Sequence, residues 1–201
     1  MHILAGEFKG RKLLSPPGKS ITRPLTGSVK KSLFDTLSGY MGGAVVLDLY
    51  CGTGTMGLEA LSRGARLCCF AERDRSVVEC LRQNIQSLSA GERSVVWAGD
   101  VTHRLPGWLA QLDAAADVVF VDPPYADTRQ WDWPQVERTI FAPLAGKLAA
   151  DGLVVLRTPG GVEVPQKLGG LAVYRTRTYG DMTVTYYGLP EQEQAPPAPE
   201  L

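Results

Sequence analysis

Cysteine and histidine are scarce in this chain, which holds four cysteines and two histidines among 201 residues. The cysteines form no Cys-x-x-Cys pair, and Cys68 and Cys69 are adjacent within an apolar run. This arrangement disfavours a disulfide framework or a zinc site and indicates reduced, mostly buried thiols in a cytoplasmic protein. His2 and His103 are the only histidines, which disfavours a metal site or a catalytic triad built on histidine, so we expect no metal ion.

Long apolar runs are absent too. No stretch approaches the roughly 18 consecutive apolar residues that a membrane-spanning helix needs. The first residues lack the basic segment followed by an apolar one that marks a secretory signal. Apolar residues make up 44% of the chain and charged residues 21%, which is typical of a globular protein. The length fits one domain with a small appendage.

Charge is balanced overall but unevenly distributed. The first 31 residues contain seven basic residues and one acid, whereas the remaining 170 contain fourteen basic residues and twenty acids. A basic segment joined to an acidic body suggests that one end of the molecule holds a polyanion. The alternative is a merely solvated basic arm.

The basic segment, residues 1–40, is predicted to form a small N-terminal extension. Residues 2–14 alternate loosely around Gly10 and predict a short hairpin, whereas the prolines of residues 15–26 predict a loop. Thr26 offers an N-cap for a helix that reaches Gly39. At the other end, residues 189–201 are rich in proline and acid, and we expect a disordered tail.

Residues 41–188 alternate between short apolar runs and amphipathic helical patterns. Runs that are apolar on both faces predict strands of a parallel sheet covered by helices on both sides. We therefore expect a doubly wound, Rossmann-like α/β fold of about seven strands, closed by an antiparallel hairpin over residues 171–178 and 182–187. The expected parallel strands are residues 44–49, 67–71, 95–98, 118–121 and 153–156. One helical pattern comprises Val77, Leu81, Ile85 and Leu88, and another Val136, Ile140, Leu144 and Leu148.

The first expected strand leads into a glycine-rich loop, Gly52-x-Gly54-x-x-Gly57. Such glycines permit a tight turn, close approach of the backbone to a ligand, and close packing of the following helix. Glu72 follows Gly52 by twenty residues, at the end of the second strand, where a carboxylate can accept the hydroxyls of a ribose. The pattern therefore predicts a nucleoside-containing cofactor, although a glycine turn without a ligand is an alternative.

Asp48 separates two classes of cofactor. A carboxylate four residues before Gly52 would repel the pyrophosphate of NAD, but it suits the sulfonium and ammonium groups of S-adenosylmethionine. The Asp-x-x-x-Gly-x-Gly spacing resembles motif I of the class I methyltransferases. We therefore expect S-adenosylmethionine, with NAD as the alternative.

The fourth expected strand runs directly into Asp122-Pro123-Pro124-Tyr125. Ligands bind at the carboxyl ends of strands in open α/β sheets, and the two prolines make this backbone rigid. The Asp122 carboxylate and the Pro123 carbonyl can accept the two N–H bonds of an exocyclic base amine, while Tyr125 offers a stacking face. A strand that ends at prolines beside an incidental acid is the structural alternative.

Taken together, these residues resemble the bacterial 16S rRNA (guanine(966)-N(2))-methyltransferase family over nearly the whole chain. Several segments carry the resemblance beyond the shared methyltransferase motifs. They are Ile3-x-Ala5-Gly6-x-Phe8-Lys9-Gly10-Arg11-Lys12-Leu13, Thr22-Arg23-Pro24-x-Thr26, Ser32-Leu33-Phe34, Gly57-Leu58-Glu59-Ala60-Leu61-Ser62-Arg63-Gly64-Ala65 and Tyr179-Gly180-Asp181. The chain departs from the family at Lys31, Asp35, Met182 and Tyr50-Cys51, none of which removes a chemical group that the reaction needs.

The resemblance implies transfer of a methyl group to the N2 amine of a guanine in 16S rRNA, within the small ribosomal subunit or its assembly intermediate. We expect the protein to be a monomer, although no sequence feature determines the oligomeric state. It implies that Asp122, Pro123, Pro124 and Tyr125 hold the guanine, and that rRNA is bound by Lys9, Arg11, Lys12 and Arg23. The implied cofactor contacts are Asp48, Gly52, Thr53, Gly54, Gly57, Glu72, Arg73, Asp100 and Val101.

Two further hypotheses stay open. The Asp122 turn would serve the N6 amine of adenine in DNA or RNA equally well, although a DNA-modifying enzyme usually adds a recognition domain for which this chain leaves no room. A catalytically inactive RNA-binding factor on the same fold is the third hypothesis, against which the intact glycine loop, Glu72 and Asp122 turn all speak.

Overall fold

The computed structural model describes residues 1–15 and 26–190, and its centre is one eight-stranded sheet. The strand order is β3-β2-β1-β4-β5-β8-β7-β6. The strands are β1 (Val45–Leu49), β2 (Leu67–Glu72), β3 (Ser94–Ala98), β4 (Ala116–Val121), β5 (Leu148–Pro159), β6 (Lys167–Leu168), β7 (Leu171–Tyr179) and β8 (Met182–Gly188). The predicted loop residues 16–25, Arg23 among them, and tail residues 191–201 lie outside the described part of the chain.

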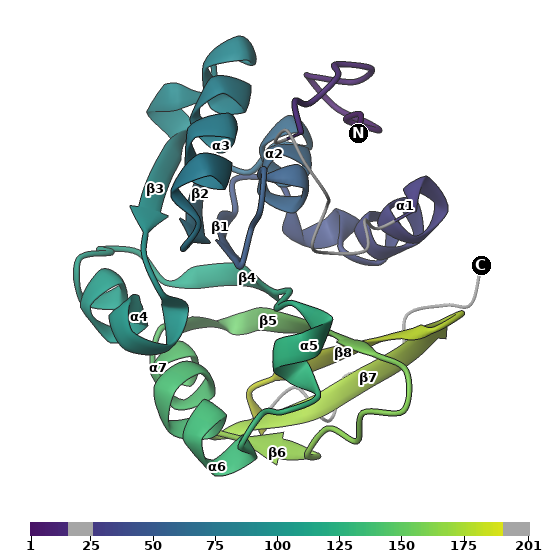
Figure 1. Cartoon of the computed structure of the whole chain (residues 1–201), viewed down its shortest axis with the longest axis vertical. Coiled ribbons are helices and arrows are strands. Elements are labelled where there is room, and N and C mark those ends of the chain that lie inside the picture. The colour runs from purple at the N-terminus through teal and green to yellow at the C-terminus, as the bar shows by residue number, and fades with distance from the viewer. Residues whose placement is uncertain (16–25, 191–201) are drawn as a thin grey trace.

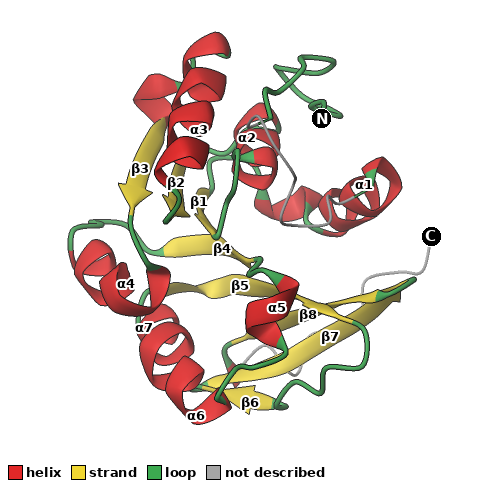
Figure 2. Cartoon of the chain, viewed as in Figure 1, coloured by secondary structure: helices red, strands yellow, loops and turns green. Residues whose placement is uncertain are grey.

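Helices alternate with the first five strands, as Figure 2 shows, whereas β6, β7 and β8 follow one another without a helix between them. The helices are α1 (Gly27–Thr36), α2 (Thr55–Ser62), α3 (Arg75–Ser87), α4 (Val101–Ala110), α5 (Tyr125–Thr128), α6 (Trp133–Val136) and α7 (Ala142–Ala145), and a π-helical turn, Glu137–Phe141, joins α6 to α7.

The pairing of the strands confirms the predicted fold class. Strands β1 to β5 pair in parallel with one another, and β8 runs antiparallel to both β5 and β7. The count differs from the prediction, because β6 adds an eighth strand that pairs with the start of β7. The C-terminal hairpin therefore does not itself close the sheet edge. Its strand β8 is inserted between β5 and β7, and the two-residue β6 forms the outer position.

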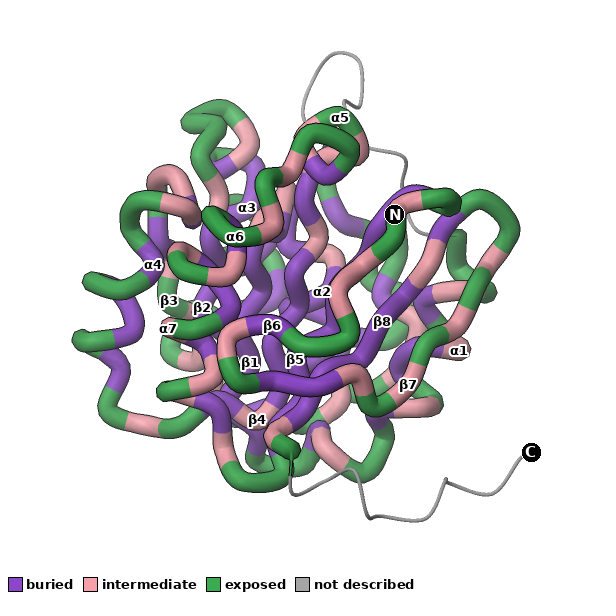
Figure 3. Tube along the Cα trace, turned by 90° about the horizontal axis from the view of Figure 1, so that it is seen from below, coloured by how far each residue is buried: buried purple, intermediate pink, exposed green. Residues whose placement is uncertain are grey.

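Two apolar cores cover the two faces of the sheet, and Figure 1 shows α1, α2 and α3 on one side with α4, α6 and α7 on the other. Alternate residues of each strand face alternate cores: Val46 of β1 packs with α1 to α3, whereas Leu47 packs with α4 and α7. Figure 3 shows the buried residues concentrated along the strands, with exposed residues at the turns and outer helix faces. The four cysteines are all buried, as predicted.

Two predicted helices show how far the apolar periodicity of the sequence could locate element boundaries. The predicted helix after Thr26 is confirmed as α1, and the Thr26 hydroxyl accepts a hydrogen bond from the Val29 amide at 3.4 Å. The assignment of Leu148 to a helix is wrong. Helix α7 ends at Ala145, before Gly146, and Leu148 instead begins β5, where it pairs with Ala116 of β4. Its apolar side chain serves the sheet as well as it would serve a helix, so periodicity alone could not separate the two.

Residues 1–15, here called the N-terminal arm, are fixed to the domain through Glu59 of α2. The arm forms a hairpin-like turn with a single antiparallel bridge between His2 and Lys12. The fully buried Glu59 carboxylate accepts the backbone amides of Leu4 and Ala5 at 2.8 and 3.1 Å, and it also pairs with Lys30 and Arg63. Ile3, Phe8 and Leu13 of the arm belong to the same apolar core as α1, α2 and α3. The division of the chain at residue 40 stays a prediction.

Candidate active site

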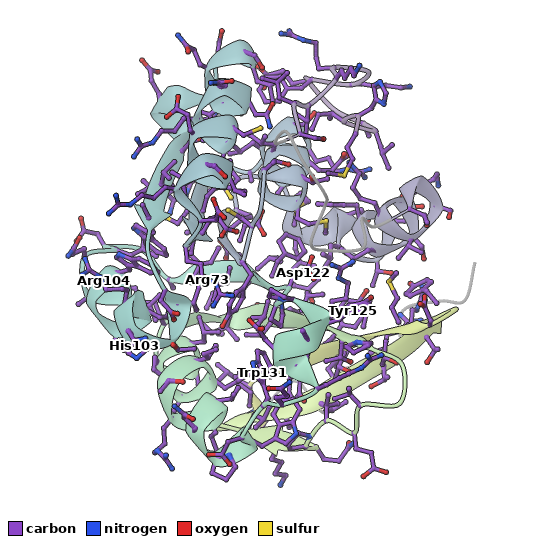
Figure 4. All side chains as sticks on the ribbon, viewed as in Figure 1. Arg73, His103, Arg104, Asp122, Tyr125 and Trp131 are labelled. Carbon is purple, nitrogen blue, oxygen red and sulfur yellow. The ribbon has the colours of Figure 1, made fainter. Side chains whose placement is uncertain are left out.

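The predicted site residues follow the carboxyl ends of neighbouring parallel strands, which meet at one edge of the sheet. A backbone hydrogen bond of 3.2 Å from the Asp122 amide to the Leu49 carbonyl joins the turn after β4 to the end of β1, where the glycine-rich loop begins. Figure 4 shows Arg73, Asp122 and Tyr125 in this region, with His103 and Arg104 on α4 and Trp131 beyond α5.

The glycine-rich loop between β1 and α2 has the tight geometry that its glycines permit. Gly52 and Gly54 have φ angles of 55° and 85°, a region that side chains rarely adopt. A Cβ atom on Gly57 would lie 2.3 Å from the Phe70 ring, so α2 packs directly on β2. Thr53 is buried, and its carbonyl accepts a hydrogen bond from the Asn84 side chain at 3.1 Å.

Asp48 lies beneath this loop rather than in front of it, with 1% of its surface exposed. One carboxylate oxygen, Oδ2, accepts the Gly57 amide at 2.8 Å, and the other, Oδ1, is buried without a hydrogen-bond partner among the described residues. Burial raises the pKa of Asp48 to about 7, and the neighbouring Asp122 and Glu72 add to the rise while the Gly57 amide opposes it. A positively charged ligand nearby would favour the ionised form.

Glu72 ends β2 and holds the loop in place. Its Oε2 accepts the Gly52 amide at 3.1 Å, and its Oε1 accepts the amides of Arg73 and Asp74 at 2.8 and 2.9 Å. Three backbone donors thus fix the carboxylate at the sheet edge, and Oε2, which accepts only one of them, keeps a lone pair for a further donor such as a hydroxyl. The neighbouring Arg73 reaches Asp127 of α5 across 3.5 Å.

Asp100 and Val101 stand at the start of α4. The Asp100 carboxylate caps this helix by accepting the Thr102 amide at 2.8 Å. Burial alone would raise the pKa of Asp100, but the hydrogen bonds from Thr102 outweigh it and the pKa lies below the ordinary value. Asp100 is therefore ionised at neutral pH, and Val101 beside it is buried. Their contact with a cofactor stays a prediction.

Two of the three acceptors in the Asp122 turn are open to a ligand, and they are the two that the sequence suggested. The Pro124 carbonyl accepts the amides of Asp127 and Thr128 at 3.0 and 3.1 Å, so it belongs to α5 and is withdrawn from a ligand. Pro123 is buried, and within the described ranges its carbonyl receives no hydrogen bond. The Asp122 carboxylate and the Pro123 carbonyl remain as the two acceptors of the turn.

Arg157 is a site residue that the sequence reasoning missed. Its Nε donates a hydrogen bond to Asp122 Oδ1, and its guanidinium carbon lies 5.4 Å from the centre of the Tyr125 ring. Burial raises the pKa of Asp122, and the Arg157 guanidinium opposes that rise. The sequence contains a feature that could have identified Arg157. This charged residue directly follows the apolar run Leu153-Val154-Val155-Leu156, at the carboxyl end of an expected strand.

Three of the residues predicted to bind RNA, Lys9, Arg11 and Lys12, lie on the N-terminal arm. Lys9 and Lys12 are exposed, whereas the Arg11 guanidinium donates to the Ser87 carbonyl at the end of α3, at 2.5 Å.

Trp131 and Trp133 are half-buried and meet edge to face, with ring centroids 5.5 Å apart. The predicted core position of Trp108 is confirmed, since it is buried and stacked on Trp97.

The site fits S-adenosylmethionine by its own chemistry. A Cβ on Gly52 would meet nothing within 4 Å, so the space beside this end of the loop is open, whereas a Cβ on Gly54 would lie 2.5 Å from the Leu81 side chain beneath the loop. Asp48 has a buried Oδ1 without a hydrogen-bond partner among the described residues, and a sulfonium bound nearby would favour its ionised form. A pyrophosphate would be repelled by the same carboxylate.

Comparison with known proteins identifies the family. Residues 1–188 match the family described as conserved hypothetical protein 95. The chain belongs to this family. YlbH of Bacillus subtilis (strain 168), whose name provisionally assigns it to the rRNA methyltransferases, is 33% identical over 93% of this chain and 98% of its own length. Ribosomal RNA small subunit methyltransferase D of Escherichia coli (strain K12) is 38% identical over 62% of this chain and 60% of its own length.

A solved structure agrees with these relatives. The structure of yhhF from Escherichia coli, whose description provisionally assigns it to the methyltransferases, superposes with a TM-score of 0.73 and 30% identity, over 93% of this chain and 96% of that one. The predicted family and the methyltransferase class of enzyme are confirmed. In the part of the chain that the structure describes, no helix is long and apolar enough to cross a membrane.

Proposed function

We propose that this protein transfers a methyl group from S-adenosylmethionine to the exocyclic N2 amine of a guanine in 16S rRNA of the small ribosomal subunit. One observation carries the proposal: the Asp122 amide is bonded to the Leu49 carbonyl, so the amine-holding turn stands directly beside the cofactor loop. The names of the relatives support rRNA as the substrate, and the sequence resemblance supports the guanine N2 amine.

The cofactor would be held by residues at the ends of three strands. Glu72 suits the ribose hydroxyls, Asp100 and Val101 suit the adenine, and the loop from Gly52 to Gly57 suits the amino-acid portion above Asp48. Thr53 and Arg73 border the same space. When bound, S-adenosylmethionine supplies a methyl carbon that bonds to the guanine nitrogen as its bond to sulfur breaks, sulfur keeps the electron pair, and the nitrogen then gives up one proton.

The Asp122 turn would orient the amine. An exocyclic amine on a base is a weak nucleophile because its lone pair is delocalised into the ring. The Asp122 carboxylate and the Pro123 carbonyl accept its two N–H bonds and stabilise the positive charge that develops on nitrogen. Tyr125 stacks on the guanine ring and sets its approach.

The N-terminal arm would hold rRNA phosphates through Lys9, Arg11 and Lys12, with Arg23 nearby in sequence. The substrate would be the assembled or nearly assembled subunit rather than naked RNA, and the protein would act as a monomer in the cytoplasm. Four buried free thiols are consistent with a reducing compartment.

Small ribosomal subunits from cells lacking this protein provide the test. Incubation with the protein and labelled S-adenosylmethionine, followed by nucleoside analysis, should yield N2-methylguanosine at one position of 16S rRNA. N6-methyladenosine as the sole product would transfer the proposal to adenine. No transfer, together with no thermal stabilisation by S-adenosylhomocysteine, would instead identify an inactive RNA-binding factor.

A further inference from the structure

Arg157 lies at the carboxyl end of β5, directly beside the Asp122 turn. Strands β4 and β5 pair in parallel with Phe120 opposite Val155. Because side chains alternate along a strand, Asp122 and Arg157, each two residues further on, point to the same side of the sheet. Their ion pair is largely buried, with 18% of the Asp122 side chain and 7% of the Arg157 side chain exposed. This ion pair therefore belongs to the floor of the site rather than to the surface.

The same guanidinium contacts the other residue of the turn that would touch the base. It lies over the Tyr125 ring at 5.4 Å, within the range in which a cation is attracted to an aromatic face. Arg157 thus contacts both the carboxylate expected to accept the amine and the ring expected to stack on the guanine. Only one of the two oxygens of Asp122, Oδ1, takes part in the ion pair, which leaves Oδ2 to an N–H donor.

We propose that Arg157 is a positioning residue for methyl transfer, which holds Asp122 as an ionised, oriented acceptor and fixes the Tyr125 ring. The inference rests on the proposed function. Arg157 touches no reacting atom and acts through these two residues. An ionised Asp122 offers the amine only acceptor oxygens, whereas a protonated carboxyl group would present a competing donor.

The surroundings make Asp122 dependent on this cation. Asp48 on β1 faces Asp122 with a like charge, Glu72 on β2 faces Asp48 in turn, and Arg157 on β5 brings the opposing positive charge. From α5, the Tyr125 ring packs against the same guanidinium. Without Arg157, burial would favour protonation of Asp122 unopposed, so the carboxyl group would lose its proton only at a higher pH. A carboxylate paired with a cation is also a weaker base, which assigns removal of the amine proton to solvent after transfer.

Four variants test the inference: Arg157→Met, Arg157→Lys, Asp122→Asn and the double variant Arg157→Met/Asp122→Asn. Single-turnover rates are measured on small subunits across the neutral pH range. Arg157→Met should lower the rate on the order of 10²-fold and move the acid limb of the pH profile to higher pH. Arg157→Lys keeps the charge, so the limb should return to its wild-type position while the rate recovers in part. The double variant should be no slower than Asp122→Asn alone, because the two residues act as a unit.

Binding of S-adenosylhomocysteine, followed by thermal shift, should be unchanged in all four variants. An unmoved acid limb in Arg157→Met, or a loss of rate that adds to that of Asp122→Asn, would overturn the inference. Should Arg157→Met fail to fold because it leaves a buried charge unpaired, the double variant removes both charges and Arg157→Lys removes neither. In that case, a double variant slower than Asp122→Asn, or an acid limb shifted in Arg157→Lys, would overturn the inference.

A titration without substrate separates this inference from the proposed function. Carbon-13 NMR of labelled aspartate, with Asp122 assigned through Asp122→Asn, reports the Asp122 pKa directly. That pKa should rise in Arg157→Met and stay in place in Arg157→Lys. If it behaves so while the wild-type protein methylates no subunit, the proposed function fails and the Arg157–Asp122 coupling stands. If methylation occurs and the pKa does not move, Arg157 is not a positioning residue.

Discussion

Asp48 connects the acidity of a single buried carboxyl group to the stability of the fold. Burial raises its pKa to about 7, whereas the unfolded chain has the ordinary value of 3.8. Between these pH values the folded protein keeps a proton that the unfolded chain has lost. The contribution of Asp48 to stability is therefore full below the lower value, falls as the pH rises toward 7, and is level above it.

Replacement of Asp48 by asparagine should remove this dependence. The amide oxygen of asparagine can still accept the Gly57 amide, but the side chain no longer titrates. As the pH rises from about 5 to about 7, the unfolding free energy of Asp48→Asn should increase by on the order of 2 kcal/mol relative to that of the wild-type protein. Urea denaturation at several pH values measures the difference. A difference that stays constant with pH would show that Asp48 has an ordinary pKa.

Asp122 is the residue on which the transfer itself should depend. Asp122→Ala removes an acceptor that stabilises charge developing on the amine, so kcat should fall by about 10²- to 10³-fold. Affinity for S-adenosylhomocysteine should change little, because the cofactor loop is left intact. Asp132→Ala is a matched control, since Asp132 is exposed and makes no capping hydrogen bond. A normal single-turnover rate in Asp122→Ala would contradict the proposed role.

At the scale of elements, the sequence predicted those features that depend on residues close together in the chain. Strands β1 to β4, helix α1 and the glycine-rich loop were predictable because their apolar period, capping residue and glycines lie within a few neighbouring residues. The pairing of Arg157 with Asp122 was not, because it joins residues 35 positions apart through the register of β4 and β5. The sequence did not predict the burial of Glu59 for the same reason, since its backbone donors come from the distant arm.

Close packing of α2 on β2 leads to a prediction about one glycine. A Cβ on Gly57 would approach the Phe70 ring at 2.3 Å and the Cys68 sulfur at 2.5 Å, and both side chains are fully buried. Gly57→Ala should therefore destabilise the protein by about 1–3 kcal/mol through overpacking. In α4, a Cβ on Gly107 meets nothing within 4 Å, so Gly107→Ala should be neutral or stabilising by up to about 1 kcal/mol. Equal thermal stability of the two variants would refute the packing argument.

At the scale of the whole molecule, the basic arm and the far edge of the sheet can be compared. Lys9 and Lys12 are exposed on the arm, while Arg138 and Lys167 are exposed near β6 and the π-helical turn. Lys9→Ala/Lys12→Ala should weaken RNA binding and reduce its salt slope by up to about two phosphate contacts. Arg138→Ala/Lys167→Ala removes equal charge and should leave the slope unchanged. Binding titrations at several salt concentrations would show whether the two double variants differ.

The attachment of the arm at Glu59 decides which experiments on it are meaningful. A truncation that removed residues 1–14 would take two backbone donors from a fully buried carboxylate and uncover the apolar surface beneath Ile3, Phe8 and Leu13. Such a shortened protein should be strongly destabilised, so its inactivity would say nothing about RNA. The arm is therefore not a detachable module, and its role in recognition can be learned only from point changes at its exposed side chains.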